Sequence, residues 1–359
     1  MKLFSLLFVV VLFCSTTVFA QEEKETFLIE KEIKHLPVIS QGNTGTCWSF
    51  ATTSFLESEI IRKGLPETDL SEMYFVKNGY KNKAKKYIMY HGNNNFGQGG
   101  LSHDVMDVIR EYGVVTQEAF PGEMIDGRYK HGELEKLLKE EITAINKGRK
   151  GFDDDDMKKI DQILDEKIGK SPEKIKIGKD EMTPLEAVDY LKIDPDDYVE
   201  LSSFNHHPYY QTFVLEIPDN WAHASYYNLP IDELMTVMMN AINNGYSVCW
   251  DGDVSEKFFV HGNGKADLPE EEIGKVDQEL RQKTFLNHTT TDDHLMHLVG
   301  LSKDSEGRLC YYTKNSWGPD SNKHGGYLHM TEDYVRLKTV GIMVHKEAIP
   351  DEIKSKLSL

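Results

Sequence analysis

The first segment that suggests chemistry is QGNTGTCWSF, which places a cysteine in a polar, glycine-rich turn. A free thiol is a weak nucleophile at neutral pH because most of it is protonated. Cys47 stands where an apolar helical pattern begins, and a helix N-terminus favours the thiolate by lowering the thiol pKa. Gly42 and Gly45 allow a tight approach of the chain into that helix. We therefore predict that Cys47 is a nucleophile.

A thiolate nucleophile needs a base, usually a histidine that a third group holds in one tautomer. The apolar run HLMHLVG supplies His297, and KNSWG supplies Asn315. An asparagine can accept from one imidazole nitrogen and leave the other facing the thiol. Trp317 would shield that hydrogen bond from water. The side-chain amide of Gln41, with the backbone N–H of Cys47, is predicted to form an oxyanion hole.

The same histidine-rich stretch has a second interpretation as a metal site, since imidazoles and carboxylates bind metals. His294 and His297 are three positions apart, so a strand directs them to opposite faces. We therefore expect only one of them, His297, to face the active site, and we expect no metal. The acidic run Asp153–Asp156 lacks the alternating ligands and the glycine of a calcium loop, and it is predicted to begin a helix.

The elements that must position these residues change in type along the chain. Helical spacing of apolar residues is found in residues 46–62, 70–80 and 102–113. Short β-rich runs dominate from about residue 197 onward. Helices first and strands later predict an α+β protein with two unlike lobes. A helical lobe would carry Cys47, and a β-barrel-like lobe would carry His297 and Asn315.

Residues from about 123 to 195 differ in composition from both the early helical part and the later β-rich part of the chain. They are rich in lysine and glutamate and helical in pattern, which predicts a helical insertion outside the core. Within this stretch, Thr183, Pro184 and Glu186 form a helix-start signature, with the threonine as the cap and the glutamate reaching back.

The first twenty residues predict a signal peptide. Lys2 is followed by a short apolar run and by small residues ending at Ala20, so cleavage is expected before Gln21. The peptidase domain would then be residues 21–359, exported to the periplasm or secreted. The apolar run is too short to span a bilayer, and no later run is long enough. We therefore expect no membrane contact after cleavage.

Charge and cysteine content limit the classes of molecule that this chain is expected to bind and the chemistry of its thiols. The net charge of −18 repels phosphate backbones, which argues against nucleic acid. Three cysteines follow the predicted signal peptide, and an odd number in an exported chain indicates a thiol kept free for chemistry. Cys249 and Cys310 lie in apolar runs and are predicted to be buried core residues.

Four motifs in chain order resemble the papain family of cysteine peptidases: QGNTGTCWSFA, GQGGLSHDVMDVI, HLMHLVG and KNSWG. The segments TPLEAVDYL, PIDELMTVMMNAINNG and WDGDV are similar to the bleomycin hydrolase or aminopeptidase C branch of that family. The gap from Cys47 to His297 is 297 − 47 = 250 positions, against roughly 130–150 in ordinary papain-like enzymes. The longer gap fits the branch with a helical insertion.

The resemblance implies a papain-like fold and peptide hydrolysis through an acyl-cysteine, without a cofactor. It implies that Gly99 and Gly100 bind the substrate backbone as an extended strand, with Trp48 and Trp317 also contacting substrate. It also implies a homo-oligomer, a hexamer in that branch. The predicted activity is that of an aminopeptidase. An endopeptidase on the same scaffold is the alternative, and a catalytically inactive binding protein is disfavoured because the whole predicted set is present.

In the bleomycin hydrolase branch, a C-terminal arm lies in the active-site cleft and admits only a free substrate N-terminus. Here the segment from Lys346 to Leu359 is short. It could reach a cleft if extended, at about 3.3–3.6 Å per residue. An exposed helical tail is the other interpretation, and the sequence leaves both open.

Overall fold

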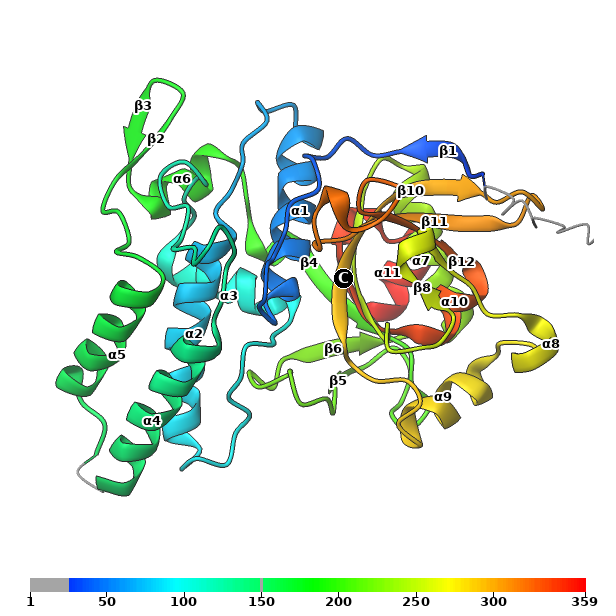
Figure 1. Ribbon diagram of the computed structural model, residues 1–359. Helices are drawn as coiled ribbons and strands as arrows, with labels where there is room; N and C mark the ends of the chain where they lie inside the picture. The colour runs from blue at the N-terminus through cyan, green and yellow to red at the C-terminus, as the bar shows by residue number, and fades with distance from the viewer. Residues whose placement is uncertain (1–25, 149–150) are drawn as a thin grey trace, which may run out of the picture.

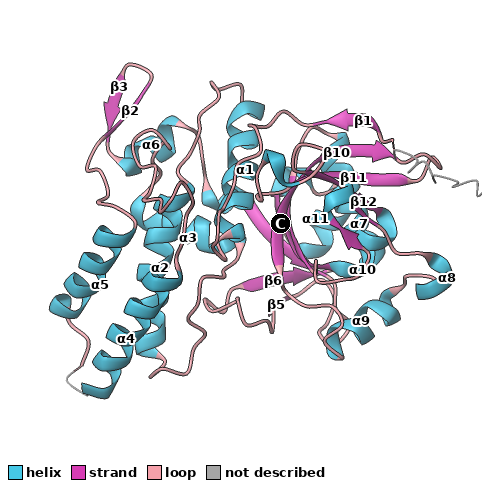
Figure 2. Ribbon diagram, viewed as in Figure 1, coloured by secondary structure: helices cyan, strands magenta, loops and turns pink. Residues whose placement is uncertain are grey.

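The computed structural model describes residues 26–148 and 151–359. The predicted signal peptide lies outside the described residues. Within them, none of the helices combines the length and the apolar character that crossing a bilayer requires. The chain forms a helical lobe and a sheet lobe side by side, which Figure 2 shows as separate groups of helices and strands. The α+β class predicted from the sequence is confirmed.

The helical lobe is built on the three helices that the apolar spacing predicted. They are α1 (Cys47–Arg62), α2 (Glu72–Met89) and α3 (Ser102–Tyr112). Helix α3 ends at Gly113, whose φ of 81° is a conformation that L-residues with side chains rarely adopt. Helix α1 lies between α2 and α3 on one side and the strands on the other (Figure 1). Cys47, the predicted nucleophile, is its first residue and therefore stands at the junction of the lobes.

The charged stretch contributes α4 (Gly132–Gly148), α5 (Asp154–Lys167), the hairpin β2 (Ile175–Ile177) and β3 (Asp180–Met182), and α6 (Pro184–Tyr190). Asp153 caps α5, and the predicted capping box of Thr183 and Glu186 opens α6. Leu138 and Leu164 are fully buried in the same hydrophobic cluster as Trp48. This stretch therefore extends the core of the helical lobe rather than standing apart from it.

The sheet lobe contains one large, mostly antiparallel sheet in the order β5-β6-β4-β13-β7-β10-β11-β12-β9-β8, with β1 added beside β10. In that order the strands are Thr212–Val214, Ser225–Asn228, Tyr198–Ser202, Thr339–His345, Val248–Gly252, His294–Lys303, Leu309–Lys314, Tyr327–Thr331, Lys265–Ala266 and Phe259–Val260, and β1 is Leu28–Glu32. The helices of this lobe are α7 (Ile231–Asn243), α8 (Glu270–Ile273), α9 (Gln278–Leu286), α10 (Glu332–Lys338) and α11 (Asp351–Leu357).

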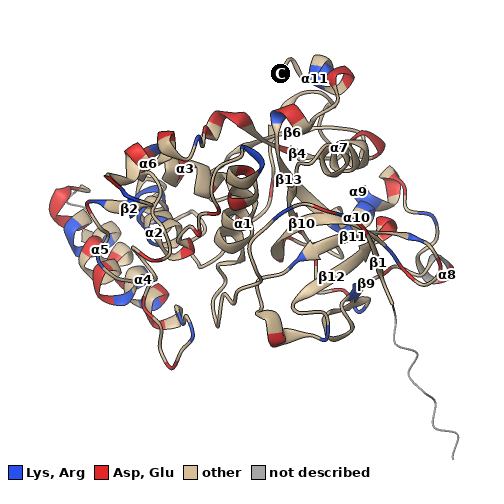
Figure 3. Cartoon of the chain, turned by 90° about the horizontal axis from the view of Figure 1, so that it is seen from above, with Lys and Arg blue, Asp and Glu red and all other residues tan. Residues whose placement is uncertain are grey.

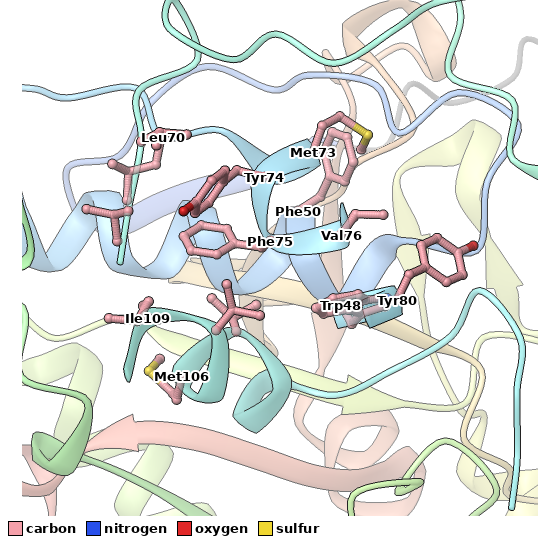
Figure 4. Close-up of a cluster of buried hydrophobic side chains, with 14 of the residues drawn as sticks. Trp48, Phe50, Leu70, Met73, Tyr74, Phe75, Val76, Tyr80, Met106 and Ile109 are labelled. Atoms are coloured by element: carbon pink, nitrogen blue, oxygen red, sulfur yellow. The ribbon is translucent and has the colours of Figure 1, made fainter. Parts of the chain in front are cut away.

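Hydrophobic packing fixes the two lobes against each other. The cluster around α1 and α2 includes Trp48, Phe50 and Phe75 (Figure 4). It also includes Cys249 and Leu295, which lie on β7 and β10. One face of the central strands therefore packs directly on α1, and the position of Cys47 relative to β10 is set by a shared core.

The C-terminal segment packs on the sheet lobe. Ile353 and Leu357 of α11 are buried in the core of that lobe, and Lys356 pairs with Glu233 of α7 at 2.9 Å. Figure 3 shows α11 well apart from α1. Of the two interpretations that the sequence left open, the arm in the cleft does not fit this segment, and the helical tail does, although the helix is docked rather than free. The helix docks because its apolar residues fit the face beside α7.

Candidate active site

Cys47 is buried at the start of α1, with 8% of its surface exposed. A helix leaves its first N–H groups without intrahelical partners, so the Cys47 N–H is available to an anion. Burial nevertheless raises the pKa of the Cys47 thiol to about 12, and the charges of Asp292, Asp251 and Asp219 also raise it, while the Leu295 amide lowers it. The expectation of a lowered thiol pKa is wrong for the unliganded protein, because burial and three carboxylates outweigh the helix terminus.

The histidine beside Asn315 is His294, not His297. The His294 Nε2 and Asn315 Oδ1 atoms are 2.7 Å apart, and both residues are buried. The Trp317 ring lies 4.9 Å from the His294 ring, between centroids, where it covers this hydrogen bond. The Leu295 amide, directly after His294, contacts the Cys47 sulfur. Burial lowers the pKa of His294 to about 4, so its imidazole is neutral.

Strand register explains why the sequence-based choice of His297 was wrong. Strands β10 and β11 are antiparallel, and His297 pairs with Lys314. Residues after Lys314 and residues before His297 therefore lie toward the same end of the β10–β11 pair, although His294 to Met296 still pair with β7. His294 and Asn315 meet there. The alternation rule correctly separates His294 from His297, but it does not say which of them faces Asn315.

His297 instead packs against α1. Its Nδ1 is 2.9 Å from Ser54 Oγ, and Ser54 also accepts from Lys314 Nζ at 2.8 Å. Its side chain is fully buried, and burial together with the charge of Lys314 lowers the pKa of His297 well below its usual value. The structure places His297 in a polar cluster between the lobes, where its Nδ1 contacts Ser54 and its Nε2 has no hydrogen-bond partner among the described residues, Asn315 included.

The side-chain amide of Gln41, the predicted oxyanion donor, is held at both ends. Its Nε2 donates to the Thr44 carbonyl at 2.7 Å, and its Oε1 accepts from Ser316 Oγ at 2.6 Å. An amide nitrogen carries two N–H groups, so one remains for substrate. Ser316 was not predicted, although its position next to Asn315 in KNSWG is a usable signal.

Gly99 and Gly100 lie beside the start of α1. Trp48 Nε1 donates to the Gln98 carbonyl at 2.9 Å, and a Cβ on Gly100 would press on the Trp48 ring. Both glycines lie close to the start of α1, as the predicted substrate contact requires. The Gly99 carbonyl, however, already accepts a hydrogen bond from the buried Lys83 ammonium.

Sequence reasoning missed a group of aspartates beside the nucleophile. Asp251 lies on β7 opposite Leu295, and Asp292 precedes His294 by two positions. Asp219 comes from the loop between β5 and β6, far away in the sequence. The charge of each of them acts on Cys47. The acidic residues in WDGDV and TDDH were visible in the sequence, but their convergence depends on tertiary structure.

Two clusters among the described residues have ligand atoms spaced closely enough to hold a metal ion. One is His206, His207 and Glu216 on the surface of the sheet lobe, and the other is Glu57, Asp69 and Glu72. In the first, the Nε2 atoms of the adjacent His206 and His207 lie 3.2 Å and 2.6 Å from the Glu216 carboxylate. The charge of Lys314 already acts on all three carboxylates of the second. Neither cluster includes Cys47 or His294.

A profile described as the Peptidase C1-like family matches residues 10–359. The chain belongs to this family. The resemblance to papain-like peptidases of the bleomycin hydrolase branch is thereby confirmed, as is the prediction of a cysteine-type peptidase.

Curated relatives share less than a quarter of the sequence over most of its length. A protein of Saccharomyces cerevisiae (strain JAY291) called cysteine proteinase 1, mitochondrial, is 23% identical, with 90% of this chain and 77% of that protein covered. Aminopeptidase E of Lactobacillus helveticus is 24% identical, covering 88% and 82%. Bleomycin hydrolase of Gallus gallus is 22% identical, with the same coverage.

A solved structure supports the fold. The crystal structure of PepW from Lactobacillus rhamnosis HN001 superposes with a TM-score of 0.74 at 19% identity, covering 92% of this chain and 84% of that one. At this identity the likeness concerns the fold, and it agrees with the two-lobed architecture predicted from the sequence.

Proposed function

We propose that this chain is an aminopeptidase of bleomycin hydrolase type, with Cys47 as nucleophile, His294 as base and Asn315 as the group that orients the base. The observation that carries the proposal is the buried hydrogen bond from His294 to Asn315, next to a residue whose amide contacts the Cys47 sulfur. This arrangement has the three parts that an activated thiol requires.

The reaction begins from a neutral pair, because burial keeps the Cys47 thiol protonated and His294 unprotonated. His294 Nδ1, the ring nitrogen that Asn315 leaves unused, accepts the thiol proton as Sγ attacks the peptide carbonyl carbon. The imidazolium formed in this step then gives its proton to the leaving amine. Water, deprotonated by His294, hydrolyses the acyl-cysteine and restores the thiol.

The negative oxygen of each tetrahedral intermediate needs donors that are already in place. The free N–H of the Gln41 amide and the backbone N–H of Cys47 supply them. Thr44 and Ser316 fix the Gln41 amide from both ends, so little reorganisation is required during the reaction.

A bridge between the lobes supports exopeptidase rather than endopeptidase behaviour. The loop 218–223 belongs to the sheet lobe, yet its backbone carbonyls accept from side chains of the helical lobe. Asn95 donates to Pro218 at 2.9 Å, Asn94 to Trp221 at 2.9 Å and Lys86 to Ala222 at 3.0 Å. This bridge stands beside Gly99 and would limit how far a substrate strand extends past the glycines.

An endopeptidase remains the second candidate, favoured by the position of α11. In the branch that this chain resembles, a terminal arm excludes long substrates, and the segment Lys346–Leu359 does not take that place here. The bridging loop is the feature that would have to do so.

Fluorogenic amides distinguish the two functions. We expect rapid cleavage of alanyl amides with a free N-terminus and slow cleavage of the same amides after N-acetylation. Cys47→Ala serves as the inactive control, and its fold is checked by circular dichroism. Preferred cleavage inside long peptides with blocked ends would show an endopeptidase. Wild-type turnover by Cys47→Ala would overturn the proposal as a whole.

A further inference from the structure

Three aspartates from separate segments meet beside the nucleophile. Asp251 lies on β7, directly opposite Leu295 of β10. Asp292 lies two residues before the start of β10, and Asp219 lies in the bridging loop 218–223. Each carboxylate acts electrostatically on Cys47. They also act on one another, since burial and then the charge of Asp292 raise the pKa of Asp251 well above its usual value.

Asp251 is the least satisfied of the three. It is only 4% exposed, and among the described residues only the neighbouring Asp292 carboxyl, with which it can share a proton, hydrogen-bonds to its carboxyl group. One oxygen of Asp292 lacks a described donor as well. Buried carboxylates are normally paired with donors or cations, because leaving them bare is costly. One shared proton and the Asp219 backbone N–H leave the pair with negative charge and with no cation of its own, so the pair is suited to a cation from outside the chain.

The nearby lysine does not supply that cation. Lys83 is buried, but its ammonium donates to the carbonyls of Gly97 and Gly99. Burial raises the pKa of Asp219 and of Asp104, and the Lys83 charge opposes that rise at both, whereas the charges that act on Asp251 and Asp292 are those of other carboxylates. Asp219 receives one hydrogen bond, from Asn95 at 3.0 Å.

Asp219 also stands on the predicted path of the substrate. Its carboxylate lies against Gly99 so closely that a Cβ on that glycine would collide with it. Beyond it, the Trp221 indole donates to Asp104 of α3 at 2.9 Å, which anchors the bridging loop to the helical lobe. A substrate strand passing the glycines therefore meets negative charge where the bridge limits further extension.

We propose that Asp251, Asp292 and Asp219 form an anionic subsite that binds the α-ammonium group of the peptide substrate beside Cys47. The inference rests on the proposed peptidase function and names what that site recognises. A primary ammonium has three N–H donors, which matches the unpaired oxygens of Asp251 and Asp292 together with Asp219. The C-terminal segment does not reach this place, so the aspartates would supply the anionic contact.

Binding at this subsite would also activate the nucleophile. The three carboxylates raise the pKa of the Cys47 thiol in the free protein. A bound ammonium cancels part of that negative charge and makes the thiolate easier to form. The protein would then be least reactive when empty and more reactive when a free N-terminus occupies the subsite.

Substitution tests the subsite without touching the reacting atoms. Asp251→Asn and Asp292→Asn keep the shape and remove the charge, and Asp180→Asn in the β2–β3 hairpin is the matched control. We expect kcat/KM for a free alanyl amide to fall about 10- to 100-fold, the usual effect of a lost hydrogen bond to a charged group. Turnover of the acetylated amide should fall far less, and Asp180→Asn should behave as wild type.

The side chain of a lysine or arginine in the substrate is the other cationic group that this subsite could bind. Acetyl-arginyl and acetyl-norleucyl amides distinguish the two groups. If the arginyl substrate is cleaved much faster than the norleucyl one, and Asp251→Asn removes the difference, the subsite recognises a side chain and the α-ammonium assignment is wrong. Equal rates for the two acetylated substrates support the α-ammonium.

Alkylation of Cys47 by iodoacetamide gives a second measurement. We expect isopropylamine, a free amine with no amide bond to cleave, to raise the alkylation rate in the wild type but not in Asp251→Asn, while N-isopropylacetamide changes neither. If the enzyme cleaves free alanyl amides and Asp251→Asn leaves both rate and labelling unchanged, the subsite is refuted and the peptidase function stands. If no amide is cleaved at all, the proposed function itself has failed.

Discussion

His294 and Asn315 are joined by a hydrogen bond of 2.7 Å, and neither side chain is more than 4% exposed. A bond so well removed from water fixes both the plane of the imidazole and the nitrogen that is left for the thiol. The positions of His294 and Asn315 along neighbouring strands matter as much as their residue types. The register of β10 and β11 brings the two side chains to one end of this strand pair.

The two histidines of HLMHLVG should separate cleanly in kinetics. His294→Ala removes the base, and we expect turnover to fall by roughly 10²–10⁴. His297→Gln should keep activity within about tenfold, because His297 contacts Ser54 rather than Asn315, but it should lower the midpoint of thermal unfolding. Steady-state kinetics and calorimetry on both variants check this. A greater loss of turnover in a folded His297→Gln would restore the sequence-based assignment.

Gln41→Ala should lower kcat by roughly 10²–10³, which is the usual loss for one oxyanion donor, with a smaller change in KM. Ser316→Ala is the matched control, since it frees one end of the same amide without removing the donor. We expect its loss of kcat to be smaller. A raised KM with unchanged kcat in Gln41→Ala would instead assign this side chain to ground-state binding.

Asp292 should make stability depend on pH in an unusual direction. Burial raises the pKa of its carboxyl to about 7 in the folded protein, above the ordinary carboxyl range of the unfolded chain. The folded state therefore binds the proton more tightly, and this stabilising contribution is lost as the pH rises from about 4 through 7. Asp292→Asn should accordingly raise the melting temperature more at pH 8 than at pH 5. An equal effect at both values, measured by calorimetry, would contradict the raised pKa.

Lys314 should be essential to stability although it takes no part in the reaction. It is 6% exposed, and its charge acts on Glu57 and Glu72, which are equally buried. Lys314→Met leaves these carboxyls without a cation, and we expect a loss of about 3–5 kcal/mol at pH 8. The loss should be smaller at pH 6, where protonation relieves the carboxyls.

Lys303→Met, on the exposed part of the same β10–β11 hairpin, is the control for Lys314→Met. Its surface pair with Glu30 should contribute at most about 1 kcal/mol. Urea unfolding of both variants at the two pH values makes the comparison. Similar losses in the two would mean that the buried carboxyls do not depend on Lys314.

Local patterns were sufficient for much of the fold and part of the site. The start of α1 at Cys47, the end of α3 at Gly113 and the capping box at Thr183 all follow from short-range rules, and the structure has them where those rules put them. Asn315 and Gln41 were also named from motifs, and the structure brings them to the junction beside α1. Their catalytic roles remain proposals to be tested by the variants above.

The parts that the sequence did not predict depend on long-range geometry. Alternation along a strand cannot decide between His294 and His297 without the register of the neighbouring strand. The thiol pKa was misjudged because the helix terminus is a local effect, whereas Asp219, Asp251 and Asp292 come from three distant segments. A short sequence motif does not predict how many carboxylates the fold brings close to the Cys47 sulfur.

The two groups proposed to react lie far apart in the chain, since Cys47 opens the first helix and His294 begins a strand 294 − 47 = 247 positions later. During synthesis the nucleophile leaves the ribosome long before its base exists. Packing of the sheet lobe on α1 both buries the thiol and brings His294 to the same junction. A chain that ends before β10 would therefore carry a cysteine without the proposed base, and we expect it to have no peptidase activity.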